Sequence, residues 1–220
     1  MSNVIQDQYS TGLSRNNIEH ALRSAGKDLA CLAPADLGLL EDFHTMGRIA
    51  TAQLVELAQI TAESAVLDAG SGVGGTARYV ADRYGCAVTA VDLTDEYCET
   101  NRWLNHLVGL DGLISVRQAD VTELPFPDAT FDVAISQHVQ MNVTDKPRLY
   151  SEARRVLRDV DGLSCGTSRL GMTSISTIPC LGPITPPAAC WSHPANYTPS
   201  SSPPGSPCST GTTSPTTRSR

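Results

Sequence analysis

The sequence predicts a doubly wound, mostly parallel α/β domain over about residues 16–158, and three observations support this. Residues 65–68 (Ala-Val-Leu-Asp) form an apolar run that ends in an acid and does not alternate, as expected of a strand covered by helices on both faces. A glycine-rich loop at 70–75 and an amphipathic helical pattern follow at once. Further runs with strand character occupy 86–92, 113–120 and 131–138.

The predicted helices carry their own boundary signals. Helix 76–84 ends at Gly85, helix 95–108 begins after Thr94 and ends at Gly109, and helix 146–158 has Pro147 in its first turn. The predicted order is therefore an alternation of strands and helices, which is typical of a parallel sheet.

The chain changes character after the last of these helices. Ten of the 14 prolines fall from Pro179 onward, and all 23 acids lie at or before Asp161. Because Gly162 to Arg220 is rich in Ser, Thr, Pro and Gly without a usable period, the sequence predicts a disordered tail over 159–220 and a sheet incomplete at its C-terminal strands. We interpret the change as a truncation or a frameshift near Asp159 to Gly162. The first 15 residues are predicted to be a flexible N-terminus.

The glycine loop predicts a nucleotide-like cofactor. Glycine lets the backbone turn tightly and approach a ligand where a side chain would prevent it. The spacing of Gly70, Gly72 and Gly75 also satisfies the dinucleotide fingerprint, so the loop alone does not name its cofactor. Asp92 ends the second strand about 20 residues past the loop, where a ribose-binding carboxylate belongs.

The whole series resembles the class I S-adenosylmethionine-dependent methyltransferases from about Leu54 to Arg158. The matching pieces are Asp-x-Gly-x-Gly-x-Gly at 68–74, the acid at 92, Gln-Ala-Asp at 118–120 and Leu-Pro-Phe-Pro-Asp-x-x-Phe-Asp at 124–132. The stretches 42–51 and 136–146 further resemble the glycine, sarcosine and dimethylglycine N-methyltransferases. The resemblance implies methyl transfer from S-adenosylmethionine to a small molecule, at an amine nitrogen.

The resemblance also implies roles for individual residues around the cofactor. At the amino-acid end of the cofactor, Asp68 would help to hold the methionine amino group and Gln137 would close over the cofactor near the reacting methyl. Asp92 would bind the ribose, Leu93 would pack on the adenine, and Asp120 and Val121 would hold the adenine edge. The glycines that would line the cofactor are Gly70, Gly72 and Gly74. A catalytic base is required only when the acceptor arrives protonated. His138, just after the fourth strand, is the candidate because imidazole titrates near neutral pH.

Structural alternatives stand beside these roles. Asp92 could cap the next helix, although Thr94 is the better-placed cap. Asp120 could be a plain turn residue, and His138 could bond to a neighbouring loop. Two other functions also stay open, namely an NAD(P)-dependent oxidoreductase that uses the same loop and a cofactor-binding remnant without turnover.

Composition bounds the remaining choices. The first 161 residues hold 13 of the 16 basic residues and all 23 acids, which argues against a nucleic-acid partner. The five His and seven Cys show no paired spacing typical of a metal site. No apolar stretch of about 18 residues predicts a membrane span and no signal peptide is recognisable, so we expect a cytoplasmic enzyme. The odd number of cysteines fits a reducing compartment.

Overall fold

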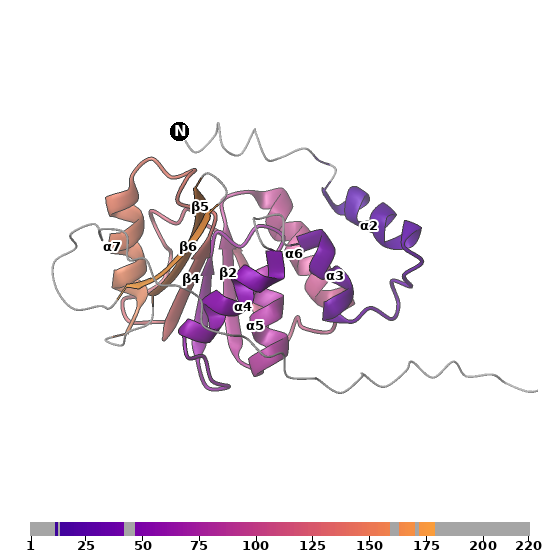
Figure 1. The fold of residues 1–220 in the computed structure, drawn as a ribbon, viewed down its shortest axis with the longest axis horizontal. Helices are drawn as coiled ribbons and strands as arrows, with labels where there is room; N and C mark the ends of the chain where they lie inside the picture. The colour runs from indigo at the N-terminus through magenta and orange to yellow at the C-terminus, as the bar shows by residue number, and fades with distance from the viewer. Residues whose placement is uncertain (1–11, 13, 42–46, 159–162, 170–171, 179–220) are drawn as a thin grey trace, which may run out of the picture. The chain divides into compact units, whose positions relative to one another are not determined.

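The computed structural model describes residues 12, 14–41, 47–158, 163–169 and 172–178, all of which belong to one compact unit (Figure 1). Residues 42–46 lie outside the described residues. They are the first half of the stretch 42–51 that resembles the glycine, sarcosine and dimethylglycine N-methyltransferases. The helices are α2 (Ser14–Ser24), α3 (Pro34–Glu41), α4 (Gly47–Leu57), α5 (Gly75–Tyr84), α6 (Asp95–Leu107) and α7 (Lys146–Val156). The strands are β1 (Ala65–Ala69), β2 (Ala87–Asp92), β3 (Ile114–Gln118), β4 (Val133–Gln137), β5 (Leu163–Arg169) and β6 (Met172–Ile178).

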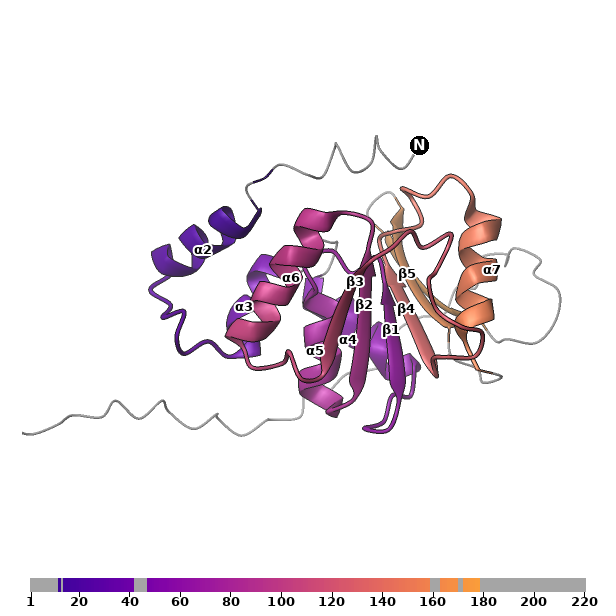
Figure 2. The same ribbon diagram turned by 180° about the vertical axis from the view of Figure 1, so that it is seen from behind.

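The strands form one sheet in the order β3-β2-β1-β4-β5-β6, whose β3, β2, β1 and β4 can be followed in Figure 2. All neighbours pair in parallel except β5 and β6, which are antiparallel. From β1 the chain adds β2 and β3 on one side and then crosses to place β4 on the other side. The doubly wound α/β prediction is confirmed, and its topological switch point lies between β1 and β4, where open α/β sheets bind ligands.

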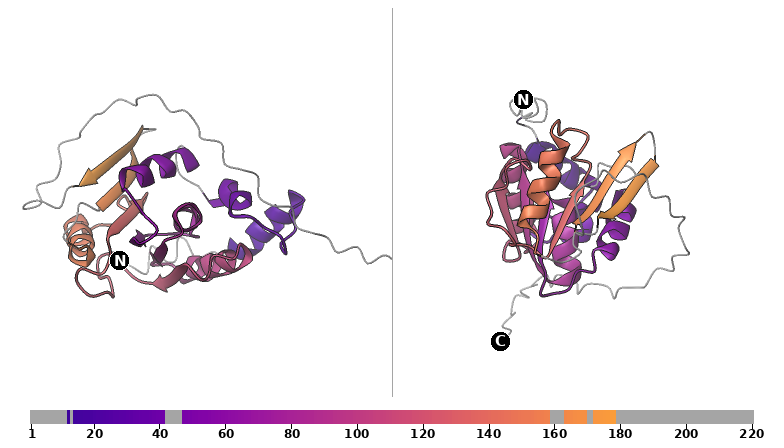
Figure 3. Two further views of the ribbon diagram at one scale, coloured as in Figure 1. Left: turned by 90° about the horizontal axis from the view of Figure 1, so that it is seen from below. Right: turned by 90° about the vertical axis from the view of Figure 1, so that its left-hand side faces the viewer.

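Alternate residues of β1 serve the two faces of the sheet. Val66 packs with apolar residues of α4 and α5, whereas Leu67 and Ala69 pack with those of α7. Figures 1 and 3 show α7 on the opposite side of the sheet from α4 and α5. Since side chains alternate along a strand, Asp68 belongs to the face of the sheet that α4 and α5 cover.

The predicted end of α5 and the predicted start of α6 are confirmed, whereas α5 begins at Gly75 and α6 ends at Leu107, each one residue earlier than predicted. Gly85 has φ 68° and donates its N–H to the Ala81 carbonyl, and Thr94 is the N-cap of α6. Helix α7 ends at Val156, two residues earlier than predicted. Leu157 is extended and bridges Phe131, and the Arg158 N–H donates to the Phe131 carbonyl, so strand-like pairing replaces the last helical bonds.

The prediction of a disordered tail directly after this helix is wrong for residues 163–169 and 172–178, which form β5 and β6. β5 pairs with β4 from Leu163 opposite Ala134, and β6 pairs back along the whole of β5. The unpaired edge of β4 offers backbone hydrogen bonds to any extended segment, and the β6 sequence Met-Thr-Ser-Ile-Ser-Thr-Ile is rich in β-branched residues. Of the predicted tail, residues 159–162, 170–171 and 179–220 lie outside the described residues.

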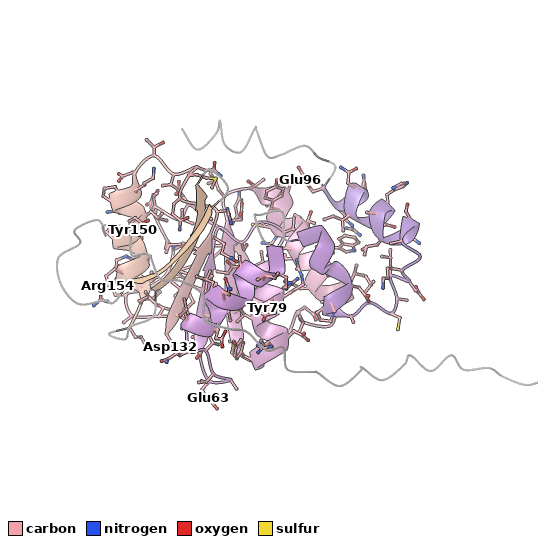
Figure 4. The ribbon with its side chains drawn as sticks, in the orientation of Figure 1. Glu63, Tyr79, Glu96, Asp132, Tyr150 and Arg154 are labelled. Carbon is pink, nitrogen blue, oxygen red and sulfur yellow. The ribbon has the colours of Figure 1, made fainter. Side chains whose placement is uncertain are left out.

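The N-terminal helix α2 is fixed to the start of α6 through Glu96. Its carboxylate accepts the N–H groups of Gly12 and Ser14 at 2.6 and 2.7 Å, and Figure 4 labels Glu96 at this junction. The anionic side chain thereby satisfies donors at a helix N-terminus, where negative charge is favoured. Within the described part of the chain, none of the helices has the length and apolar character needed to span a bilayer.

Candidate functional site

A cavity of about 510 Å³ lies at the carboxyl ends of the central strands. It is bounded by the loop after β1, the end of β2, the turn after β3 and the end of β4 with the loop that leads to α7. The lining residues are Gly70, Gly72, Asp92, Leu93, Thr94, Tyr97, Asp120, Val121, Thr122, Gln137, His138, Val139, Asn142, Val143, Thr144 and Asp145. The cavity thus lies at the switch point of the sheet.

The glycine loop is held against β2 by three backbone donors. The N–H groups of Gly70 and Ser71 both donate to the Val91 carbonyl at 2.8 Å, and the Gly72 N–H donates to Asp92 Oδ2 at 2.8 Å. The loop therefore has a fixed position beside the cavity.

Two glycines of this loop are required for different reasons. Gly70 has φ 84°, and a Cβ there would lie 2.1 Å from Val139 Cγ2. Gly72 has φ 53°, and a Cβ would meet nothing within 4 Å, because this face of the loop opens into the cavity. A ligand can approach the Gly72 backbone closely, which is the geometry a nucleotide cofactor needs.

Gly74 is placed differently from the expectation. It is the N-cap of α5 with φ 92°, and it does not line the cavity. A Cβ at this position would lie 2.1 Å from Asn101 Oδ1 of α6. Packing against α6 is therefore one sufficient reason for a glycine here, and its contact with the cofactor stays a prediction.

Asp92 organises the end of β2. Oδ2 accepts the Gly72 N–H, and Oδ1 accepts the Thr94 N–H at 2.9 Å. Burial raises the pKa of Asp92, and these backbone donors act in the opposite direction. The alternative that Asp92 caps α6 is not what the structure shows, since Thr94 is the N-cap and Asp92 bridges the cap residue to the glycine loop.

Asp68 is 3% exposed and lies outside the cavity lining. Burial, together with the nearby charge of Asp92, raises the pKa of Asp68 to about 7, although the Ala77 N–H and the Arg78 charge oppose this. Asp68 Oδ2 has no hydrogen-bond partner among the described residues. A buried carboxylate oxygen without a donor is costly, and a ligand ammonium would satisfy it.

The residues predicted for the adenine end lie together on the wall formed by β2 and β3. Leu93 and Val121 line the cavity as apolar groups, and Asp120 lines it beside them. Asp120 Oδ1 accepts both the N–H and the hydroxyl of Thr122, at 2.8 and 2.7 Å. Asp120 is therefore also the turn residue that its alternative predicted, and the two roles are compatible.

Gln137 and His138 form the wall at the end of β4. Gln137 Oε1 accepts the hydroxyls of Thr76 at 2.7 Å and Thr51 at 3.3 Å. His138 has φ 57°, a left-handed conformation that is uncommon outside glycine and is found at functional sites. Both residues line the cavity, so the structure brings the proposed cofactor and acceptor residues to one place.

Sequence reasoning missed several walls of the cavity. Tyr97 lies one turn into α6, and Asn142, Thr144 and Asp145 belong to the loop after β4. The rule that ligands bind beyond the carboxyl ends of strands could have included this loop.

Among the described residues, no group of three or more His, Cys, Asp or Glu side chains is placed to hold a metal ion.

The comparisons agree with this site. Residues 67–161 match a family described as a methyltransferase domain (Methyltransf_11). The fold, the site and this match therefore agree that residues 67–161 are similar to a methyltransferase domain. The match leaves the oxidoreductase alternative without support.

Two curated relatives of this chain are N-methyltransferases. The chain is 42% identical over 100 residues to a sarcosine/dimethylglycine N-methyltransferase of Halorhodospira halochloris, covering 46% of this chain and 36% of the relative. It is 36% identical over 118 residues to a glycine/sarcosine/dimethylglycine N-methyltransferase of Actinopolyspora halophila, covering 54% and 21%. The chain thus spans about a third or less of the length of these curated relatives.

Solved structures show the same fold. The YcgJ protein of Bacillus subtilis has a TM-score of 0.51 and 27% identity, with 54% of this chain and 50% of that chain covered. A geranyl diphosphate methyltransferase solved with S-adenosylmethionine has a TM-score of 0.53 and 24% identity, with 61% and 53% covered.

Proposed function

We propose that this domain transfers a methyl group from S-adenosylmethionine to a small-molecule acceptor, at an amine nitrogen. The observation that carries the proposal is the glycine loop tied to Asp92, with the open face of Gly72 turned into a 510 Å³ cavity at the switch point. The N-methyltransferases among the relatives support the choice of an amine over other nucleophiles.

The residues fit the cofactor at three places. Asp92 presents its carboxylate to the ribose hydroxyls, Leu93 and Val121 give the adenine an apolar wall, and Asp68 Oδ2 lacks a donor that an ammonium would supply. When bound, S-adenosylmethionine supplies an activated methyl group on its sulfonium. The chain has to orient the acceptor, and orientation alone is worth about 7 to 11 kcal/mol of a barrier in favourable cases.

We propose His138 as the residue that accepts a proton from an acceptor that arrives as an ammonium. Its place on the cavity wall beyond β4 supports this role. The methyl-accepting nitrogen needs a lone pair, so the base must act before or during transfer. We also propose a cytoplasmic location, which is supported by the free cysteines Cys31, Cys86 and Cys98.

Isothermal titration of the full chain with S-adenosylhomocysteine and with NAD tests the cofactor. Binding of S-adenosylhomocysteine alone supports the proposal, and binding of NAD alone contradicts it. Methyl transfer from labelled S-adenosylmethionine to glycine, sarcosine and dimethylglycine then tests turnover. Binding without transfer to any amine would favour the cofactor-binding remnant.

A further inference from the structure

Two helices hold the side-chain amide of Gln137, through residues that do not line the cavity. Thr76 of α5 and Thr51 of α4 both direct their hydroxyls to Gln137 Oε1, at 2.7 and 3.3 Å. Thr51 is fully buried and Thr76 is 9% exposed, so neither hydroxyl has ready access to water. A buried hydroxyl without a partner is costly, and these bonds therefore fix the amide in one orientation.

This orientation gives the two ends of the amide different surroundings. The oxygen is occupied by the two threonines. The nitrogen makes no hydrogen bond with any residue in the described part of the chain, and Gln137 lines the cavity. An amide nitrogen carries two N–H donors and no acceptor. Gln137 thus offers the cavity a donor, which matches a ligand oxygen and not an ammonium.

The strand order indicates which part of the cofactor reaches Gln137. Asp120 and Gly70 lie just beyond β3 and β1, and Asp92 and Gln137 are the last residues of β2 and β4. These strands are neighbours in the order β3-β2-β1-β4 along the sheet. With the ribose at Asp92 and the adenine toward Asp120, the amino-acid end of the cofactor points toward β4. That end carries one ammonium and one carboxylate.

The charged residues that line the cavity are acidic, so the carboxylate of the cofactor needs a neutral hydrogen-bond donor. Asp92, Asp120 and Asp145 are among the described residues that line it, and this lining contains no Lys or Arg. Asp68 lies outside the lining, but its negative charge at this end of the sheet disfavours a nearby carboxylate. The Gln137 amide is a neutral donor at the end of β4, where the amino-acid end of the cofactor lies.

We propose that Gln137, oriented by Thr51 and Thr76, donates its amide N–H to the carboxylate at the amino-acid end of the cofactor. Gln137 is then a cofactor-binding residue with a defined chemical partner, and the two threonines are positioning residues. The inference rests on the proposed function, because it requires that S-adenosylmethionine occupies the cavity.

The test compares two ligands that differ at this end. S-adenosylhomocysteine carries the amino-acid carboxylate, and 5′-methylthioadenosine lacks the whole amino-acid end while keeping the adenosine. Titration of the full chain with both is expected to show that Gln137→Glu weakens S-adenosylhomocysteine about 10-fold or more and changes 5′-methylthioadenosine less than about twofold. Gln53→Glu on the exposed side of α4 makes the same change of charge away from the cavity and serves as the control.

The threonines are tested by removing a hydroxyl while keeping the side-chain shape. Thr76→Val is expected to weaken S-adenosylhomocysteine about fivefold, Thr51→Val less because its bond is longer, and Thr76→Ser is expected to restore wild-type affinity. 5′-methylthioadenosine should bind all three variants as it binds the wild type. Thr100→Val, which alters a buried threonine of α6 that does not line the cavity, is the matched control.

The outcomes separate the two proposals. If the wild type binds neither ligand, the proposed function fails. If the wild type binds both and Gln137→Glu weakens both equally or neither, the proposed function stands and the carboxylate contact is overturned. Binding of 5′-methylthioadenosine also reports an intact cavity in each variant. Should Gln137→Glu fail to fold, the selective loss in Thr76→Val and its recovery in Thr76→Ser decide the matter.

Discussion

The Gly72 N–H donates to Asp92 Oδ2 at 2.8 Å, and this bond joins the loop after β1 to the end of β2. The same carboxylate holds the Thr94 N–H at the start of α6. One side chain therefore sets the distance between the glycine loop and the next helix, and the same residue lines the cavity.

Asp92→Ala is expected to weaken S-adenosylhomocysteine by about 1.5 to 3 kcal/mol, because the ribose hydroxyls lose a charged acceptor and the glycine loop loses its tether. Calorimetric titration measures this. Asp95→Ala, three residues on and exposed, is the control and should bind as the wild type does. Wild-type affinity in Asp92→Ala would contradict the ribose assignment.

Gly72→Val is expected to abolish measurable cofactor binding, because the new side chain enters the open face of the loop and takes an unfavourable positive φ. Gly112→Val, where a Cβ also meets nothing within 4 Å but lies off the cavity, is the matched control. An unchanged titration in Gly72→Val would show that the loop is only a turn.

Gly74→Ala should act on stability rather than on the cavity. The methyl group would overlap Asn101 and sit at φ 92°, at a cost of about 2 kcal/mol in the free energy of unfolding. Urea denaturation with Gly112→Ala as the reference measures the loss. A Gly74→Ala protein of wild-type stability but with weakened cofactor binding would return Gly74 to the ligand contacts.

Asp68 predicts a pH dependence of stability. Burial raises the pKa of Asp68 to about 7 from 3.8, so the folded state holds this proton more tightly than the unfolded chain. Stability from this group is therefore fully present only below about pH 3 and is lost as the pH rises from about 4 to 7, by about 4 kcal/mol in all. Above that range the group contributes no further change.

Asp68→Asn should remove this fall. Denaturation curves at pH 5 and pH 8 are expected to differ less in the variant than in the wild type. The exposed Asp82→Asn on α5 is the control and should keep the wild-type difference. An identical pH dependence in Asp68→Asn and the wild type would contradict the raised pKa.

His138→Asn is expected to lower turnover about 100-fold and leave S-adenosylhomocysteine affinity nearly unchanged. Asparagine is chosen because it tolerates the left-handed backbone at φ 57°. His106→Asn, an exposed histidine of α6, is the control. Equal losses of turnover and affinity in His138→Asn would assign His138 a structural role.

The sequence alone was sufficient for the parts of the fold that depend on local pattern. The apolar run before Asp68 and the cap at Gly85 were predictable because burial and positive φ restrict the residues that fit. The resemblance to the methyltransferases implied that Asp92, Leu93, Val121 and Gln137 surround one cofactor, and these residues line one cavity. The hydrogen bond between Thr51 and Gln137 could not be predicted from the sequence, because the two residues are 86 positions apart and no local pattern joins them.

The strands β5 and β6 are a part of the fold that the sequence composition did not predict. Their Ser- and Thr-rich sequence indicates a disordered segment when read by composition, but backbone pairing to β4 depends little on side-chain identity. Gly74 was assigned to the cofactor because its spacing matched a motif, whereas its neighbour in space is Asn101. Motif spacing identifies a glycine that is needed without saying what occupies the space beside it.

The contact between Gly70 and Val139 bears on redesign of the site. The missing side chain of one residue is filled by the branched side chain of the other, and both face the cavity from opposite halves of the sheet. Val139→Ala would enlarge the cavity and would also remove the side chain that packs against Gly70 of the glycine loop. Position 139 therefore links the size of the cavity to the packing of the loop that faces the cofactor.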